Sequence, residues 1–360
     1  NTDLPEYPPT AENYRFVWPR DAAFHLVAAQ ILDSPGVADR RSNFIQWLNN
    51  AEQFTETGLL IKRYGTNGVL DLRYGSDYQP AQAGAMLWAL HETQTSPDPQ
   101  ADELMRKLAN GLSGAWQGTH FKTATQDLWE NRSTIPAAGD VFTYSAAACA
   151  HGLHLAVKQW EGRTAETDKW AQTASEMQAV LAFDDGKSHY TRKIFTNGIK
   201  DSKDDTLDSS LNALIYPFYN ANSAADRATL PKRERTVAEI NKVLYESPRG
   251  VSRYLLDTYD SIVRPDGREF KGGRWPLETF WDALALHRTG HPDEAKVVYF
   301  ELIKYLDELY EEGKLPNNWL PEQIYDKPEK GQPDLDGKGV VPLAWSHAMF
   351  VITTRELGIR

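Results

Sequence analysis

The chain has 360 residues, of which 41% are hydrophobic and 25% charged, a balance typical of a globular protein with one large domain or two ordinary ones. Its formal net charge of −11 argues against nucleic acid or an anionic membrane as a partner, because both are themselves negatively charged. No apolar run reaches the roughly 18 residues that a membrane-spanning helix needs.

Hydrophobic periodicity and turn residues predict a chain made almost entirely of helices. We expect helices at residues 21–33, 38–54, 80–92, 102–116, 142–160, 166–183, 206–216, 224–245, 277–289, 292–311 and 342–356. The segments between them are rich in Gly, Pro and aromatic residues and carry almost no strand pattern. The sequence therefore disfavours an α/β fold.

The predicted helices alternate in character along the chain. Those that begin near residues 21, 80, 142, 206, 277 and 342 are apolar and rich in small residues, and the other five carry charge on one face. A helix that is apolar all round is buried, whereas an amphipathic helix faces water. The apolar helices begin every 59 to 71 residues, which indicates repeated helix hairpins.

This alternation predicts an all-α fold, an (α/α)6 toroid with inner and outer rings of helices, formed by residues 1–360 as a single domain. Six inner helices but only five outer helices can be counted. We therefore expect the first outer helix to be missing from this chain and to lie upstream of Asn1, since an uncovered inner helix exposes apolar surface.

Each long aromatic loop comes directly before an inner helix, so in a toroid the loops gather at one end of the ring. Residues suited to a polyhydroxylated ring concentrate there, because aromatic faces cover C–H surfaces while carboxylates and arginines bond hydroxyls. They are Tyr14, Trp18, Arg20, Asp21, Tyr74, Asp77, Tyr78, Gln82, Trp129, Glu130, Asp204, Asp205, Asp208, Arg274, Trp275, Glu278, Glu322 and Gln323.

Two of these carboxylates are candidates for catalysis. Glycosidic hydrolysis needs one protonated acid and one base or nucleophile. Glu130 follows Trp129, and an apolar neighbour helps keep a carboxyl group protonated. Glu322 lies in the last loop, which a ring places beside the first. Taken singly, each glutamate is typical of a surface residue and Asp21 is typical of a helix N-cap. Because all three are expected at the same end of the ring, together they predict a catalytic site there.

Four motifs occur in order over nearly the whole chain. They are Tyr14-x-x-x-Trp18-x-Arg20-Asp21, Asp127-Leu128-Trp129-Glu130, Gly273-Arg274-Trp275-Pro276, and Pro321-Glu322-Gln323 followed by Trp345-Ser346-His347. In order and spacing they resemble glycoside hydrolase family 15, the family of glucoamylases, glucodextranases and some trehalases. The resemblance implies an (α/α)6 barrel and inverting exo-hydrolysis of α-glucosides with release of β-glucose.

The same resemblance implies a role for individual residues. Glu130 falls at the position of the general acid and Glu322 at that of the general base. The remaining site residues implied are Tyr14 for the attacking water and Arg20, Asp21 and Arg274 for the terminal glucose. Independently of the resemblance, the flat aromatic faces of Trp18, Trp129 and Trp275 are expected to bind the substrate. The N-terminal β-sandwich common in the family is absent from this sequence, as is any carbohydrate-binding module.

Several alternatives stay open at this stage. A trehalase or a phosphorolytic enzyme fits the same barrel, and so does a non-catalytic glucan-binding barrel, so the linkage (α-1,4, α-1,6 or α,α-1,1) and chain length are undecided. The histidines do not cluster at ligand spacing, and we expect no metal or cofactor. Cys149 reads as a core residue, and a single cysteine favours the cytoplasm, although secretion with a processed N-terminus remains an alternative.

Overall fold

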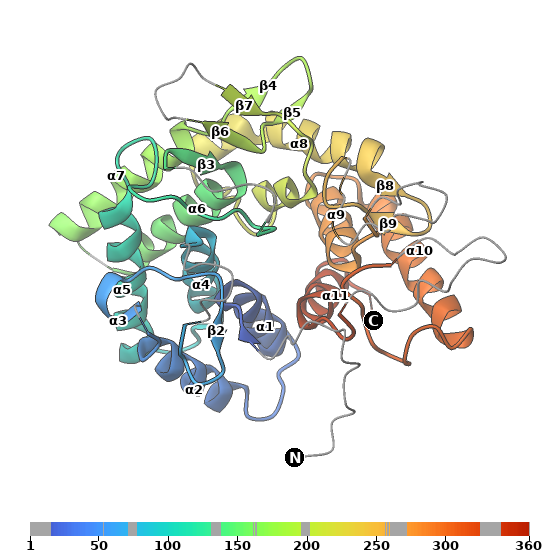
Figure 1. Ribbon diagram of the computed structural model, residues 1–360, viewed down its shortest axis with the longest axis horizontal. Helices are drawn as coiled ribbons and strands as arrows, with labels where there is room; N and C mark the ends of the chain where they lie inside the picture. Colours follow the sequence, from blue (N-terminus) through green and yellow to red (C-terminus); the bar gives the residue numbers. More distant parts are fainter. Residues whose placement is uncertain are drawn as a thin grey trace.

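Two concentric rings of helices form the fold in the computed structural model (Figure 1). The structure describes residues 16–359 except 53, 71–77, 131–137, 161, 163, 196–201, 256, 258, 260–271 and 325–339. The inner ring consists of α1 (Pro19–Ile31), α4 (Pro80–Thr93), α6 (Thr143–Gln159), η1 (Ser209–Leu214), α9 (Pro276–Arg288) and α11 (Ala344–Glu356). Each inner element packs against the next, and α11 returns to α1, which closes the ring.

The outer ring covers the inner one. Within the described residues it holds α2 (Val37–Asn49), α5 (Pro99–Ala115), α7 (Ala165–Ala179), α8 (Ala224–Leu244) and α10 (Pro292–Glu311), and a single turn, α3 (Phe54–Thr57), follows α2. The predicted all-α toroid is confirmed. None of the described helices is long and apolar enough to cross a bilayer.

One predicted α-helix is replaced by a shorter 3-10 helix in the structure. Residues 206–216 were expected to form an α-helix, but the structure has only the short 3-10 helix η1 there. Asp208 caps its start, because Asp208 Oδ1 accepts from the Ser210 N–H at 2.9 Å. Pro217 limits its other end, since proline lacks an N–H and restricts the backbone of the residue before it.

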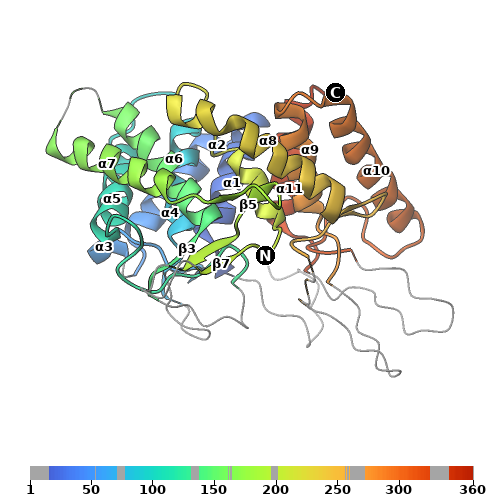
Figure 2. The same ribbon diagram turned by 90° about the horizontal axis from the view of Figure 1, so that it is seen from above.

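Short antiparallel strands, which the sequence did not predict, tie the loops together. They form the pairs β1 (Phe16–Val17) with β2 (Tyr64–Gly65), β4 (Phe183–Asp184) with β5 (His189–Tyr190), and β8 (Tyr245–Glu246) with β9 (Gly250–Val251), and the sheet β3 (Asp140–Phe142), β6 (Lys193–Phe195), β7 (Ser202–Asp204). Phe16 pairs with Gly65, and Ile194 pairs with both Val141 and Lys203. In Figure 2 strands β3 and β7 lie with the loops along one side of the helices.

Small residues allow the inner helices to pack closely. A Cβ atom added at Gly84 of α4 would lie 2.6 Å from the backbone oxygen of Ala148 on α6, and one at Gly152 would lie 2.8 Å from the oxygen of Gly84. Both contacts are shorter than real side chains allow, so glycine is what lets the two backbones meet. Glycine at these two positions is therefore a packing requirement of the contact between α4 and α6.

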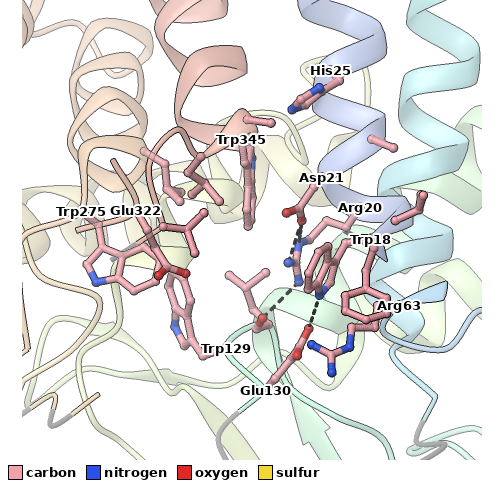
Figure 3. Close-up of a pocket in the computed structure, with 18 of the residues that line it drawn as sticks. Trp18, Arg20, Asp21, His25, Arg63, Trp129, Glu130, Trp275, Glu322 and Trp345 are labelled. Atoms are coloured by element: carbon pink, nitrogen blue, oxygen red, sulfur yellow. Dashed lines mark hydrogen bonds and ion pairs between the residues drawn. The ribbon is translucent and has the colours of Figure 1, made fainter. Parts of the chain in front are cut away.

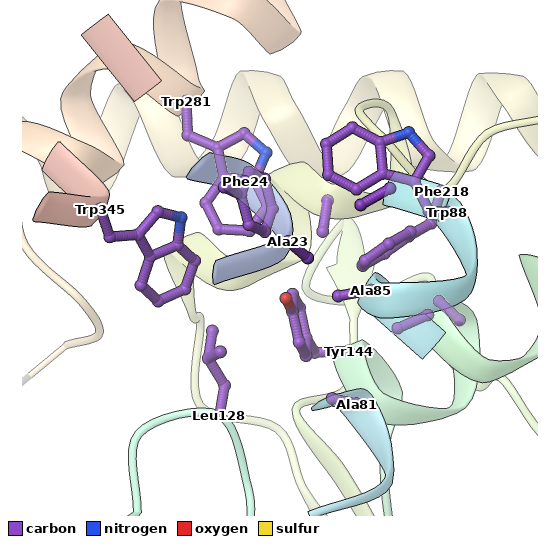
Figure 4. Close-up of a cluster of buried hydrophobic side chains, with 14 of the residues drawn as sticks. Ala23, Phe24, Ala81, Ala85, Trp88, Leu128, Tyr144, Phe218, Trp281 and Trp345 are labelled. Carbon is purple, nitrogen blue, oxygen red and sulfur yellow. The ribbon is translucent and has the colours of Figure 1, made fainter. Parts of the chain in front are cut away.

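The centre of the ring is filled rather than hollow (Figure 4). Phe24 of α1 packs on Trp88 of α4, Trp281 of α9 and Trp345 of α11, with ring centroids 5.0, 5.6 and 5.3 Å apart. Tyr144 of α6 joins the cluster through Trp281. Because these buried rings occupy the interior, a cavity at the loop end of the barrel has a closed floor.

Candidate active site

A cavity of about 320 Å³ lies among the loops and helix starts at one end of the barrel (Figure 3). Its polar lining residues are Arg20, Asp21, His25, Arg63, Glu130, Arg253 and Glu322, and its aromatic ones are Phe16, Trp18, Trp129, Tyr259, Trp275 and Trp345. The volume is at the lower end of the range of ligand pockets, which run from about 300 to 1,000 Å³.

Proline sets the geometry of two walls. Helices α1 and α9 both begin with proline, and the residue before each, Trp18 or Trp275, is the extended N-cap. Proline favours the first helical position and pushes the preceding residue into extended backbone. Each indole therefore leaves its helix start and lines the pocket. Asp21 was read as a possible N-cap; the helix begins earlier, so Asp21 lies in its first turn instead.

Arg20 and Asp21 form a fixed pair on one side of the cavity. The Nη2 and Nε atoms of Arg20 lie 2.8 and 3.1 Å from Oδ1 of Asp21, and its Nη1 donates to the Leu128 carbonyl at 3.1 Å. The guanidinium also covers the ring of Trp345, with Cζ 4.5 Å from the centroid. Arg20 is therefore immobilised by partners on three elements, with its charge balanced by Asp21.

Gln82 on α4 binds the backbone of Arg20 and so helps to position the Arg20–Asp21 pair. Its Oε1 accepts from the backbone N–H of Arg20, and its Nε2 donates to the Lys62 carbonyl at 2.9 Å. Gln82 is fully buried and does not line the cavity. The sequence placed it at the mouth, whereas the structure uses it to join α4 to α1.

Glu130 lies at the pocket wall with its carboxylate on Trp18. The Trp18 indole N–H donates to Oε1 of Glu130 at 3.1 Å, and Lys62 Nζ lies 3.8 Å from Oε2. Burial raises the pKa of Glu130 above its usual range, although Arg20 and Lys62 oppose that shift. The backbone of Glu130 is in the left-handed region, with φ of +52°, which is uncommon for a residue other than glycine and clusters at functional sites.

The loop that carries Glu130 is anchored on its other side. The Trp129 indole N–H donates to both carboxylate oxygens of Asp208, at 3.1 and 3.0 Å. Arg192 joins Asp208 to Asp127, with N–O distances of 3.1 and 2.8 Å. The Trp129 ring packs against Trp275 at 5.6 Å between centroids. These contacts hold the strained turn at Glu130 in place.

Glu322 reaches the same cavity from the opposite wall, where Figure 3 shows it beside Trp275 and across from Glu130. Glu322 is 7% exposed. Its N–H donates to the Val340 carbonyl at 2.8 Å, and the neighbouring Ile324 exchanges two backbone bonds with Arg274. The two glutamates thus lie at one mouth and face each other.

The structure places one predicted substrate-binding residue outside the lining of this cavity. Arg274 is not among the lining residues, and its guanidinium pairs with Glu246. Arg253, which the sequence reasoning missed, lines the cavity together with Arg20 and Arg63. Both Nε and Nη2 of Arg253 lie 2.7 Å from Asp257, and aromatic rings surround the guanidinium. The rings are those of Tyr259, Trp275, Trp129 and Tyr254, with centroids 4.4 to 5.3 Å from Cζ.

The remaining predicted residues fall into two groups. Tyr14, Tyr74 and Asp77 lie outside the described residues. The others support the pocket or lie away from it: Tyr78 forms backbone bridges with Ile61 and Thr125, Asp208 holds Trp129, Asp204 lies 3.9 Å from Arg192, Asp205 pairs with Lys187 at 2.6 Å, Gln323 accepts from the Gly273 N–H at 3.0 Å, and Glu278 is fully buried.

Comparison with known proteins identifies the family to which this geometry belongs. The family model described as glycosyl hydrolases family 15 matches residues 79–355. This chain belongs to glycosyl hydrolase family 15. The predicted resemblance is therefore confirmed, and the matched region begins with Gln79 and includes Glu130, Arg253 and Glu322.

This family-15 chain has a curated relative that is similar in sequence. A curated relative, an uncharacterized glycosyl hydrolase of Methanocaldococcus jannaschii, is 27% identical over 96% of this chain. The chain spans about half of that relative's length, 51%.

Solved structures have the same fold at lower identity. A glycosidase variant has a TM-score of 0.69 at 18% identity, covering 97% of this chain and 90% of that one. A bacterial glucoamylase complexed with acarbose has a TM-score of 0.63 at 17% identity, covering 95% and 49%. The glucoamylase of Saccharomycopsis fibuligera has a TM-score of 0.63 at 14% identity, covering 96% and 86%.

Proposed function

We propose that this family-15 protein is an inverting, exo-acting α-glucosidase. It removes the non-reducing terminal glucose from α-1,4- or α-1,6-linked glucosides or glucooligosaccharides and releases β-D-glucose. The observation that carries the proposal is the pair Glu130 and Glu322, which face each other across one closed-floored pocket. Among the solved neighbours, one glycosidase variant holds glucose and a bacterial glucoamylase holds acarbose, which agrees with a sugar ligand.

The closed floor supports exo action. The buried rings of Phe24, Trp88, Trp281 and Trp345 fill the barrel beneath the cavity, so a glucan chain has no way through. Only a chain end can enter. In the pocket, the Arg20–Asp21 pair supplies donors and acceptors for hydroxyl groups, while the indoles of Trp18, Trp129 and Trp275 cover the apolar faces of sugar rings.

In the proposed reaction, Glu130 donates its proton to the glycosidic oxygen while the bond from that oxygen to the anomeric carbon breaks. The pKa of Glu130, raised by burial, keeps that proton available. A water molecule attacks the anomeric carbon from the opposite face and gives its proton to Glu322. One displacement inverts the configuration, so an α-glucoside yields β-glucose.

The experiment that tests this proposal is an incubation with maltose, isomaltose, trehalose and longer glucans, in which proton NMR follows the anomer that is released first. We expect β-glucose from maltose or isomaltose without any requirement for phosphate. Release of α-glucose first, dependence on phosphate, or activity confined to trehalose would each contradict the proposal in favour of a different enzyme of this barrel. No turnover of any glucoside would favour a binding protein.

A further inference from the structure

Hydrogen bonds join the backbone just before Glu322 to α11 and to the residues that precede this helix. The Leu320 carbonyl accepts from the Leu343 N–H at 2.8 Å, and the Glu322 N–H donates to Val340. Two further backbone groups of this segment, the Leu320 N–H and the Pro321 carbonyl, bond to side chains of α11. We call residues 320–322 the base loop, since Glu322 is its last residue.

Two neighbouring side chains in the first turn of α11 bind the base loop. The hydroxyl of Ser346, which is fully buried, donates to the Pro321 carbonyl at 2.9 Å. The Nε2 atom of His347 accepts from the Leu320 N–H at 3.1 Å. The residue before them, Trp345, stacks under Arg20 at 4.5 Å. One helical turn therefore contacts both the base loop and the sugar-binding arginine.

The partner of His347 fixes its protonation state. Because a backbone N–H can only donate, Nε2 must be the unprotonated nitrogen and the ring proton must lie on Nδ1. Burial, with a smaller contribution from His25 on α1, lowers the pKa of His347, which favours the neutral ring that this hydrogen bond requires.

We propose that Ser346 and His347 are positioning residues that set the location of the Glu322 carboxylate relative to the attacking water. This inference rests on the proposed function, in which Glu322 is the base. Neither residue is among those that line the cavity. Loss of either bond lets the base loop shift, and a misplacement of about 1 Å in a catalytic constellation costs on the order of 100-fold in rate.

The test compares variants that differ in their ability to accept the Leu320 N–H. His347→Gln places an amide oxygen at a reach similar to that of Nε2, whereas His347→Leu has no acceptor, and Ser346→Ala removes the second bond alone. Thr354→Val is the matched control on α11, because Thr354 contacts Tyr299 at 2.8 Å, away from the base loop. Steady-state kinetics on maltose and on α-glucosyl fluoride are measured for each, with calorimetric titration by acarbose to count binding-competent molecules.

We expect His347→Leu to lower kcat about 10- to 100-fold on both substrates, with KM changed less than about threefold. Both substrates suffer because the fluoride needs no acid but still needs the base. Ser346→Ala should also lower kcat, by a smaller factor. His347→Gln should retain most of the activity, and Thr354→Val should have the kcat and KM of the wild type. The acarbose stoichiometry should stay constant throughout.

Three outcomes would overturn the positioning role. The first is a wild-type kcat in both His347→Leu and Ser346→Ala, and the second is an impairment of His347→Gln equal to that of His347→Leu. The third is an acarbose stoichiometry that falls in parallel with kcat, because that result means a loss of folded protein. If His347→Leu does not fold, Ser346→Ala and His347→Gln decide the matter. Failure of the wild-type protein to hydrolyse any α-glucoside would instead refute the proposed function.

Discussion

Replacing Trp18 with phenylalanine removes one donor from the candidate acid and leaves most of the aromatic surface in place. The Trp18 indole N–H donates to Glu130 at 3.1 Å. Phenylalanine keeps a ring at this position for the contacts with Phe16, at 6.0 Å between centroids, and with Arg63, whose Cζ lies 5.6 Å from the ring. The substitution therefore tests the electrostatics of Glu130 more than the shape of the pocket.

The sign of the effect follows from the hydrogen bond. A donor stabilises the ionised carboxylate more than the protonated acid, so its removal raises the pKa of Glu130 further. Hydrogen bonds to charged groups contribute about 1.5–3 kcal/mol, and one pKa unit corresponds to about 1.4 kcal/mol. Because water can take part of the vacated place, we expect a rise of about one unit.

The assay is the pH dependence of kcat on maltose and on α-glucosyl fluoride. On maltose, the basic limb reports ionisation of the general acid and should move upward by about one unit in Trp18→Phe. On the fluoride, which needs no proton, the basic limb should not respond to the substitution. Arg274→Met is the control, since Arg274 lies outside the pocket, and should leave both profiles unchanged. A basic limb that stays in place or moves downward on maltose would refute this reasoning.

Three further predictions concern the sugar pocket, the core and a buried acid. Arg253→Lys, which loses the bidentate contact with Asp257, should raise KM for maltose at least about tenfold, whereas Arg274→Lys should change it less than about threefold; equal effects would contradict the assignment. Gly84→Ala should lower the free energy of unfolding in urea by at least about 1–3 kcal/mol, because its methyl group would meet the Ala148 carbonyl. Burial raises the pKa of Asp282 to about 7 in the folded state, so the stability that the protonated Asp282 contributes should decline as pH rises from about 4 to 7. In urea unfolding, Asp282→Asn should lack this decline. If the free energy of unfolding of the variant has the same pH dependence as that of the wild type, the prediction is wrong.

The sequence predicted the helices well because their signals are local. The inner helices are apolar and rich in small residues, and prolines such as Pro80 and Pro276 mark the start of some of them; the structure begins α4 and α9 at these two residues. The prediction of an α-helix at residues 206–216 was wrong because the Asp208 cap and the following Pro217 limit the helix there to η1. The paired strands of two or three residues could not be predicted, because they are too short to show alternation and depend on loops that meet only in space.

The candidate site was predicted in part for the same reason. Glu130 and Glu322 were found from short motifs, but the choice between Arg274 and Arg253 depends on where Glu246 and Asp257 lie in the fold. Nothing in the local sequence except an aspartate four residues after Arg253 indicated that this arginine, and not Arg274, lines the pocket.

The most direct test of the central claim is the activity of Glu130→Gln and Glu322→Gln on maltose and on α-glucosyl fluoride, with the released anomer followed by NMR. The proposed roles predict that Glu130→Gln loses activity on maltose but keeps a measurable part on the fluoride, since fluoride leaves without a proton. Glu322→Gln should lose activity on both, and the wild-type carboxyl groups should lie about 6.5–9.5 Å apart, with room for the attacking water. Near-normal turnover of maltose by Glu130→Gln, or α-glucose as the first product of the wild type, would contradict the account.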